Sequence, residues 1–241
     1  MRINKYLADM GICSRREADR LIKAGKVNID LKIADVGAIL KDGDKIYLNG
    51  NLIGNFGSDK KPEKVVIAVN KPKGIVCTTT DNDRALNIVD YIGYPLRIYP
   101  IGRLDKESTG LILMTNQGEL ADRIMKAANC HDKEYFVTVN KFIDDNFIKK
   151  MSAGVYLHEL KVKTRKCIVK KKGEKSFVII LTQGLNRQIR RMCAELGYKV
   201  TDLKRTRIMN IRLGALKSGE WRRLGSDEIK HIQDYKIKQL K

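Results

Sequence analysis

The chain has 241 residues, and its 48 Lys and Arg against 28 Asp and Glu give a formal net charge of +20. With 43% hydrophobic residues it can bury a substantial core, and its length suits one large domain or a large domain with a small module. This charge excess is unusual for an enzyme of small metabolites and predicts a polyanionic partner. A membrane surface would favour a basic amphipathic helix with aromatic residues on its apolar face, but the chain has a single Trp, so we expect nucleic acid.

Targeting signals and metal-binding patterns are not evident. No apolar run approaches the roughly 20 residues of a membrane span, and the first residues lack the hydrophobic centre of a signal peptide, so we expect a cytoplasmic protein. The five cysteines are dispersed and only three histidines accompany them, which predicts reduced thiols and no metal site. Cys130 and His131 are neighbours, but adjacent residues rarely face one another, which disfavours a catalytic dyad.

Residues 1–50 have the pattern of a compact module. Ser14 and Glu17 have the spacing of a capping box, and the apolar residues that follow at helical intervals predict a helix that ends at Gly25. Short strands are expected at residues 27–29 and 45–48, separated by a turn at 41–44. The helix and its exit are crowded with basic residues, namely Arg15, Arg16, Arg20, Lys23 and Lys26. We interpret them as an RNA-binding face, with a solvated helix surface as the alternative.

A linker and a second domain are expected next. Residues 51–63 are rich in Gly, Asn and Lys and carry no apolar period, which predicts a linker. An apolar strand is expected at residues 65–69, and the Pro and Gly of the segment 70–74 predict a turn close to its end.

Residues 99–116 hold the most informative pattern of the second domain. Gly102 frees the backbone ahead of the segment Arg103–Asp105, Gly110 ends a polar turn, and residues 111–114 have the apolarity of a buried strand. A charged pair on a loop that a buried element supports is typical of a binding or catalytic site. An ordinary loop salt bridge is the alternative.

Two helices are expected between the following strands. Asn116 and Glu119 have capping-box spacing, and residues at helical intervals from Leu120 through Ile124 to Ala127 form one apolar face. A further helix is expected from residue 144 to 151.

A strand is expected at residues 133–139, where Tyr135 shares a face with Val137 and Val139. Core packing is the ordinary explanation for a tyrosine in that position. Another strand is expected at residues 177–181, followed by a helix that begins near residue 187.

In this last helix Ile189 and Cys193 face the core, whereas Arg187 and Arg190 are three apart and share a side. A guanidinium group at the start of a helix is well placed to meet a carboxylate or a phosphate. The tail at residues 199–223 is arginine-rich, and the alternation of strands and helices predicts a mixed sheet.

Four motifs follow the N-terminal module in a fixed order, namely N-K-P-K-G at 70–74, I-G-R-L-D-K-x-S-x-G-L at 101–111, K-E-Y at 133–135 and G-x-N-R-Q-I-R-R-M at 184–192. Together they resemble the RsuA-type ribosomal pseudouridine synthases, and the resemblance covers nearly the whole chain. The N-terminal pattern, with C-S-R-R-E-A-D-R-L-I at its centre and D-G-D near its end, resembles the S4 RNA-binding domain.

The resemblance implies an α+β protein in which a small S4 domain of the α/β kind precedes a catalytic domain with a mixed, mainly antiparallel sheet. The expected bounds are residues 1–60 for the first domain and 64–241 for the second. The implied activity is the isomerisation of uridine to pseudouridine in ribosomal RNA. The 23S RNA of the large subunit is the expected target, with transfer RNA or another structured RNA as the alternative, and we expect a monomer.

Carried onto this sequence, the resemblance makes Asp105 the essential carboxylate and Arg190 its ion-pair partner. Tyr135 would stack on the uracil and serve in removing the proton from C5. Arg103 would fill the space that the flipped base leaves in the RNA, and Ile189 would pack beside the base. Further substrate contacts are expected from Leu104, Lys71 and Arg187.

The residue types suit this chemistry, because moving ribose from N1 to C5 of uracil needs no redox change, metal or cofactor. Asp105 could attack C1′, attack C6 or abstract the 2′ proton, and the sequence leaves these three routes open. Extruding a base from RNA costs a few kcal/mol, which stacking on Tyr135 and side-chain insertion must offset.

Two other functions fit parts of the sequence. A non-catalytic S4-containing RNA-binding or ribosome-assembly factor would explain the charge and the first domain, but it would leave Arg103, Asp105, Tyr135 and Arg190 without a role. A hydrolase with an aspartate nucleophile would need a second acid or a metal cluster, and the sequence offers neither pattern.

Overall fold

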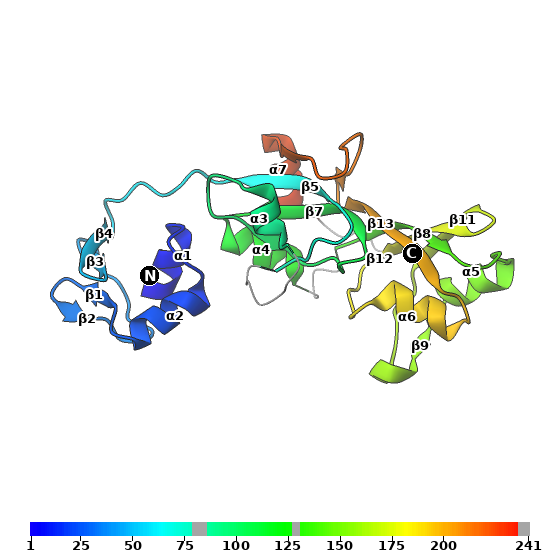
Figure 1. The fold of residues 1–241 in the computed structure, drawn as a ribbon, viewed down its shortest axis with the longest axis horizontal. Helices are drawn as coiled ribbons and strands as arrows, with labels where there is room; N and C mark the ends of the chain where they lie inside the picture. Colours follow the sequence, from blue (N-terminus) through cyan, green and yellow to red (C-terminus); the bar gives the residue numbers. More distant parts are fainter. Residues whose placement is uncertain (79–85, 127–130, 236–241) are drawn as a thin grey trace. The chain divides into compact units, whose positions relative to one another are not determined.

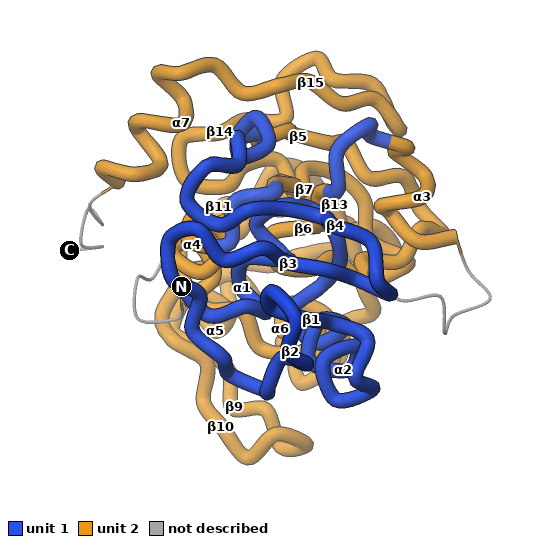
Figure 2. The backbone as a smooth tube through the Cα atoms, turned by 90° about the vertical axis from the view of Figure 1, so that its left-hand side faces the viewer, with its two compact units in different colours: residues 1–65, 94–97, 116–118 blue, residues 66–93, 98–115, 119–241 orange. Residues whose placement is uncertain are grey.

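The computed structural model of the chain describes residues 1–78, 86–126 and 131–235. The chain forms two compact units (Figure 2). Unit 1 comprises residues 1–65, 94–97 and 116–118, and unit 2 comprises residues 66–93, 98–115 and 119–241. None of the described helices is long and apolar enough to cross a membrane.

Unit 1 combines two helices with a small antiparallel sheet of strand order β2-β1-β3-β4 (Figure 1). Its elements are α1 (Ile3–Asp9), α2 (Arg15–Lys23), β1 (Val27–Ile29), β2 (Lys32–Ile33), β3 (Lys45–Leu48) and β4 (Asn51–Asn55). Apolar residues of both helices and of the sheet, such as Leu7, Ile22 and Ile46, form its core. The predicted cap of α2 is present, since Ser14 Oγ accepts a hydrogen bond from Glu17 N at 3.1 Å. The Glu17 carboxylate, however, pairs with Arg20 at 2.8 Å.

The linker predicted for residues 51–63 is wrong in its first part, because β4 belongs to the sheet of unit 1. It pairs antiparallel with β3, and Asn49 and Gly50 form the turn between the two strands, both with positive φ. Asn-Gly is a favoured sequence for such a hairpin turn. The weak apolar period of the strand is compensated by backbone hydrogen bonds and by Ile53, which packs against the core.

Unit 2 is built on a sheet that, within the described residues, has nine strands in the order β11-β12-β8-β13-β7-β5-β15, with β6 paired to β7 and β14 to β13. All of these pairs are antiparallel except β13 with β7. The strands are β5 (Val66–Lys71), β6 (Tyr99–Ile101), β7 (Thr109–Thr115), β8 (Lys133–Val139), β11 (Ile168–Gly173), β12 (Ser176–Leu181), β13 (Val200–Ile208), β14 (Ile211–Arg212) and β15 (Trp221–Arg223). The predicted fold class, an S4 domain before a mixed and mainly antiparallel sheet, is confirmed.

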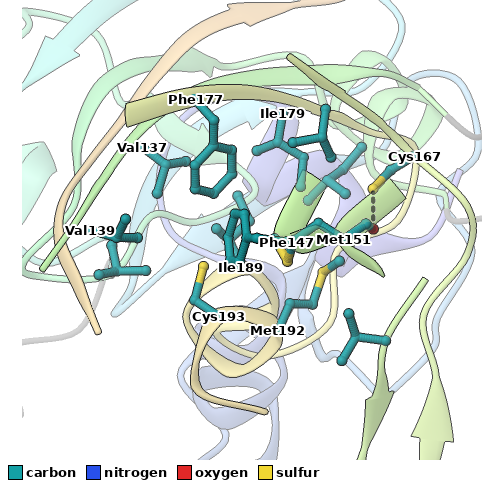
Figure 3. Close-up of a cluster of buried hydrophobic side chains, with 14 of the residues drawn as sticks. Val137, Val139, Phe147, Met151, Cys167, Phe177, Ile179, Ile189, Met192 and Cys193 are labelled. Carbon is teal, nitrogen blue, oxygen red and sulfur yellow. Dashed lines mark hydrogen bonds between the residues drawn. The ribbon is translucent and has the colours of Figure 1, made fainter. Parts of the chain in front are cut away.

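The helices of unit 2 are α3 (Ile88–Ile92), α4 (Gly118–Met125), α5 (Asp145–Ser152), α6 (Gln188–Glu195) and α7 (Ser226–Gln233). A short β-ribbon, β9 (Tyr156–Leu157) with β10 (Val162–Lys163), encloses the 3₁₀ turn η2 (His158–Leu160). One hydrophobic cluster of unit 2 lies between α5, α6 and the strands β8 and β12 (Figure 3). In it the rings of Phe147 and Phe177 meet edge to face with centroids 5.4 Å apart, and Ile189 and Cys193 of α6 are buried beside them, as predicted.

Several local predictions need correction. Gly110 lies inside β7 at a φ of +99° instead of ending the turn before the strand. Asn116 does not cap α4, because its Oδ1 accepts a hydrogen bond from Val65 N at 3.0 Å. Ala127, expected on the apolar face of this helix, and Cys130 lie outside the described residues.

The arginine-rich tail contains more regular structure than its sequence indicates. β13 lies between β8 and β7 in the middle of the sheet, and β15 pairs with β5 and forms one edge of the sheet. Charged residues interrupt the apolar pattern of β13, and a central strand receives much of its stabilisation from its two neighbours instead of from its own propensity. Local pattern therefore missed the strand that joins the two halves of the sheet.

Candidate active site

The loop between β6 and β7 carries the segment Arg103–Asp105. Leu104 is 8% exposed, and its N–H donates to Cys77 Sγ at 3.4 Å. Ser108 N–H donates to the carbonyl oxygen of Asp105 at 3.0 Å, so the chain turns directly after the aspartate. Arg103 is exposed and Asp105 half-buried. Leu104 thus anchors the loop, and the charged residues on either side of it remain accessible.

Two guanidinium groups from the start of α6 lie next to the Asp105 carboxylate. Arg190 Nε and Arg187 Nη1 are each 3.8 Å from Asp105 Oδ2. At this distance the pairs are ionic contacts and not hydrogen bonds, and Arg190 Nε has no hydrogen-bond partner among the described atoms. Catalytic hydrogen bonds are often long before a substrate binds. The structure thus brings Asp105 together with the partner predicted for it.

The two arginines differ in how firmly they are held. The Arg190 side chain is 15% exposed, and it also donates to Ser108 Oγ at 3.3 Å and to Val200 O at 3.4 Å. The Arg187 side chain is 50% exposed. Arg190 is therefore a fixed positive charge beside Asp105, and Arg187 is a cation that can reach a ligand from solvent.

A cavity of about 490 Å³ opens at this loop, which is a normal size for a ligand pocket. Its wall includes residues of the Asp105 loop, β8, β12, α6 and β13. Most of the predicted substrate-contacting residues of the second domain line it, namely Arg103, Leu104, Asp105, Tyr135, Arg187 and Ile189. Motifs that are far apart in the sequence thus converge on one site.

Tyr135 is half-buried on β8 and packs against the same hydrophobic cluster as Val137 and Val139. The predicted shared face is therefore correct. The ring also lines the cavity, and the guanidinium carbon of Arg205 lies 6.0 Å from its centroid. Core packing alone does not describe this tyrosine, because part of it faces the pocket.

Lys71, predicted to bind the substrate, has a different position. Its side chain is completely buried, and its Nζ donates to the carbonyl oxygens of Pro72 and Ile75 at 2.8 Å each and to that of Lys106 at 3.4 Å. Burial lowers the pKa of this ammonium group. Lys71 therefore holds the turn after β5 against the Asp105 loop and does not reach the ligand cavity.

Arg205 is a cavity-lining residue that was not predicted from the sequence. It is 3% exposed, and its Nε donates to Leu111 O at 2.6 Å. Leu203, two residues earlier on β13, is a core residue, so Arg205 lies on the same buried face of a strand that was not predicted. An arginine on the buried face of a strand is rare and favours a specific role.

The basic residues predicted to bind RNA in unit 1 all belong to α2 or its exit. Each of them is exposed, namely Arg15, Arg16, Arg20, Lys23 and Lys26. The opposite face of the helix is apolar, with Ala18 and Ile22 buried in the core. The helix therefore fixes its basic face toward solvent.

His131 also lines the cavity, and its Nδ1 is buried without a hydrogen-bond partner among the described atoms. His131 is 5% exposed, burial lowers its pKa, and its Nε2 lies 3.2 Å from the carbonyl oxygen of Arg123. Across residues 1–78, 86–126 and 131–235 there is no group of three or more His, Cys, Asp or Glu arranged to hold a metal ion.

A cavity lined by an aspartate and a tyrosine, with an arginine fixed beside the aspartate, is the arrangement of an enzyme's active site. The family model of RNA pseudouridylate synthases matches residues 65–195, and that of the S4 domain matches residues 1–46. The chain belongs to the RNA pseudouridylate synthase family, and it acts on RNA.

Relatives extend the similarity over almost the whole chain. The dual-specificity RNA pseudouridine synthase RluF of Escherichia coli K12 is 52% identical over 229 residues, covering 95% of this chain and 77% of the relative. Ribosomal large subunit pseudouridine synthase B of Bacillus subtilis 168 is 33% identical over 238 residues, covering 96% and 95%. A pseudouridylate synthase crystal structure superposes with a TM-score of 0.70 at 28% identity, covering 96% of this chain and 99% of that one.

Proposed function

We propose that this protein converts specific uridines in the ribosomal RNA of the large subunit into pseudouridine, with Asp105 as the essential group. The observation that carries the proposal is the arrangement at the cavity. Asp105 and Tyr135 line one pocket, and Arg190 is fixed beside the carboxylate. Names of relatives such as ribosomal large subunit pseudouridine synthase B support the choice of RNA.

The reaction is an isomerisation, so all atoms of the substrate are retained. The N1–C1′ bond breaks, a C5–C1′ bond forms, C5 loses its proton and N1 gains one. No oxidant or reductant is consumed. The enzyme needs a carboxylate near the ribose or the uracil ring, a group that accepts the C5 proton and room for the base to turn.

The arginines approach Asp105 at one of its two carboxylate oxygens. Both described ion pairs of its carboxylate go to Oδ2, from Arg187 and Arg190. We assign the chemical step to Oδ1, whichever of the three routes it follows. Arg190 is held beside the carboxylate and can orient it, and Arg187, which is more exposed, suits a phosphate of the bound RNA.

The other cavity residues would hold the extruded base. The ring of Tyr135 would stack on the uracil, and its phenol oxygen would take part in removing the C5 proton. Leu104 and Ile189 are 8% and 5% exposed and supply apolar surface beside the base. Arg103, exposed at the tip of the loop, would enter the RNA where the base had been.

We further propose a division of labour along the chain. Residues 1–60 would dock folded RNA through the basic face of α2, and residues 64–241 would hold the flipped uridine. We further propose that the protein acts as a monomer. A ribosomal RNA substrate would support a cytoplasmic location for the enzyme.

The test is a modification assay on fragments of 23S RNA, 16S RNA and transfer RNA, with pseudouridine detected by its alkali-resistant carbodiimide adduct. Asp105→Asn should bind RNA within about a few-fold of the parent affinity and form product at less than about a hundredth of the parent rate. The matched control is Glu107→Gln, which removes an exposed carboxylate two residues away that pairs with Lys73 at 3.3 Å. It should stay active. Product from Asp105→Asn at a near-parental rate would refute the assigned role.

A further inference from the structure

The guanidinium of Arg205 is buried against the backbone on both sides of Asp105. Its Nε donates to Leu111 O at 2.6 Å, and its Nη1 lies 3.5 Å from the carbonyl oxygen of Arg103. These two carbonyl groups flank the segment that holds Asp105. The planar guanidinium group of an arginine has several N–H donors in a fixed arrangement and can bind both carbonyl oxygens at once. The ammonium group of a lysine, on a flexible side chain, does this less well.

The position of Arg205 in the sheet also connects the two halves of the site. In the parallel pair of β13 with β7 its partner is Gly110, and in the antiparallel pair of β13 with β8 its partner is Tyr135. A Cβ atom on Gly110 would lie 2.3 Å from the carbonyl oxygen of Arg205 and 2.7 Å from its nitrogen. The backbones of the loop-bearing strand and of β13 are therefore in direct contact here.

The charge of Arg205 is not explained by an ion pair. Among the described residues no carboxylate pairs with it, and its Nη2 is buried without a hydrogen-bond partner. Burying an unpaired cation opposes folding. Its guanidinium carbon lies 6.0 Å from the Tyr135 ring centroid, within range of a cation–π contact. The contacts of this residue are thus directed to the site and not to a structural carboxylate.

We propose that Arg205 is a positioning residue of the active site. It holds the carbonyl oxygens at both ends of the Asp105 segment and lies over the ring of Tyr135, so the carboxylate and the phenol keep one relative arrangement. The inference rests on the proposed function, because it names the group that aligns the two residues to which the chemistry is assigned.

The experiment measures kcat and KM for pseudouridine formation by the full-length Arg205→Met and Arg205→Lys variants. Loss of alignment should lower kcat about 100-fold in Arg205→Met and leave KM for RNA within about threefold, because a displacement of about 1 Å costs that much in rate. Arg205→Lys keeps the charge and one donor direction, so its kcat should lie between those of the parent and Arg205→Met.

The matched control is Arg207→Met. Arg207 is two residues further along β13, its side chain is 12% exposed, and it pairs with Asp132 at 2.6 Å and Glu134 at 3.5 Å. This variant should lose thermal stability and retain a kcat close to the parental one. If the Arg205 and Arg207 variants lose kcat in proportion to the fall in Tm, Arg205 has only a structural role and the proposal is overturned.

A second measurement separates positioning from folding. Adding guanidinium to Arg205→Ala, at concentrations that leave Tm unchanged, should restore kcat at least about tenfold with saturation, and the same addition to Arg207→Ala should not. An active parent with unaffected Arg205 variants, or no rescue of Arg205→Ala, overturns this inference alone. If the parent forms no pseudouridine on any of the RNAs, the proposed function fails first and the inference fails with it.

Discussion

At Tyr135, packing and chemistry concern different atoms of one side chain. The ring packs against the cluster that includes Val137 and Phe177, and this would stabilise the strand whatever the protein did. That packing comes from the apolar ring, whereas the phenol oxygen is polar. Its presence on a cavity-lining residue is what points to a role in proton removal.

Tyr135→Phe should therefore retain the fold and RNA affinity but lose product formation, because the ring remains and the hydroxyl that we propose for proton removal is gone. Thermal unfolding and the carbodiimide assay check both halves of this prediction. The control is Tyr198→Phe, which alters a tyrosine of the same hydrophobic cluster whose hydroxyl donates to Phe142 O at 3.2 Å. If Tyr135→Phe turns over like the control, Tyr135 is a packing residue only.

Burial has the largest effect on the pKa of the Cys193 thiol. Cys193 is completely buried in α6, and burial raises the pKa of its thiol to about 12, although the nearby charge of Arg190 acts in the opposite direction. The unfolded thiol has the ordinary value of 9.0. Between these two values the unfolded chain loses its proton and the folded chain keeps it.

The free energy of unfolding should consequently fall as pH rises above about 9, by on the order of 1 kcal/mol at pH 10 from this thiol. Below pH 8 the thiol contributes no pH dependence, because it is protonated in both states. Urea unfolding of the parent and of Cys193→Ala at pH 8 and pH 10 measures the effect, and the variant should show the smaller decrease. Equal decreases in both proteins would contradict the prediction.

Among the elements, the parallel pair of β7 with β13 determines where the site forms. β7 follows the Asp105 loop in the chain. β13 pairs with β7 on one side and with β8 on the other, and Gly110 of β7 is the partner of Arg205 of β13. Glycine is required there for two separate reasons, a φ of +99° and the lack of space for a Cβ. The contact brings a loop strand and the tyrosine strand into one sheet.

Gly110→Ala should be strongly destabilising, and Gly74→Ala isolates the cause. Gly74 has a similar φ of +89° but no atom within 4 Å of an added Cβ, so its substitution has only the backbone cost. We expect Gly110→Ala to lose about 1–3 kcal/mol more than Gly74→Ala, because backbone atoms must move apart. Equal losses in urea unfolding would show that the close approach to Arg205 is unimportant.

The whole molecule carries a net charge of +20, and much of its interaction with RNA is expected to be electrostatic. The exposed cations of α2 concentrate part of this charge on one small unit. The groups assigned to the chemistry belong to the other unit. Affinity and turnover should therefore respond to different substitutions.

Replacing all five basic residues of α2 and its exit by glutamine in the full chain should raise KM for RNA more than it lowers kcat. The slope of log K against log salt should become flatter by roughly one unit for each phosphate that the variant no longer binds. The control replaces Lys41 and Lys45 of the same unit, which are exposed outside α2. An unchanged slope in the five-fold variant would assign RNA docking to another surface.

The local parts of this protein follow from its sequence. The strand at Lys133–Val139 and the helix that Asp144 caps lie where residue periodicity predicts them, since alternation and capping involve only near neighbours. The ordered motifs also predicted the family, and they marked Asp105 before any geometry was known. These features depend on short stretches of chain that carry their own signal.

Tertiary structure decided the rest. Three features depend on which strands pair and in which register. β13 joins β8 to β7, Lys71 is buried against the Asp105 loop, and Arg205 donates to the backbone carbonyl groups that flank this loop. Residues far apart in sequence meet only after those pairs have formed, and each pair is stabilised by partners that a local pattern does not contain. An arginine in such a sequence can lie in solvent or, like Arg205, against the backbone of the Asp105 loop, and only its neighbours in space determine which.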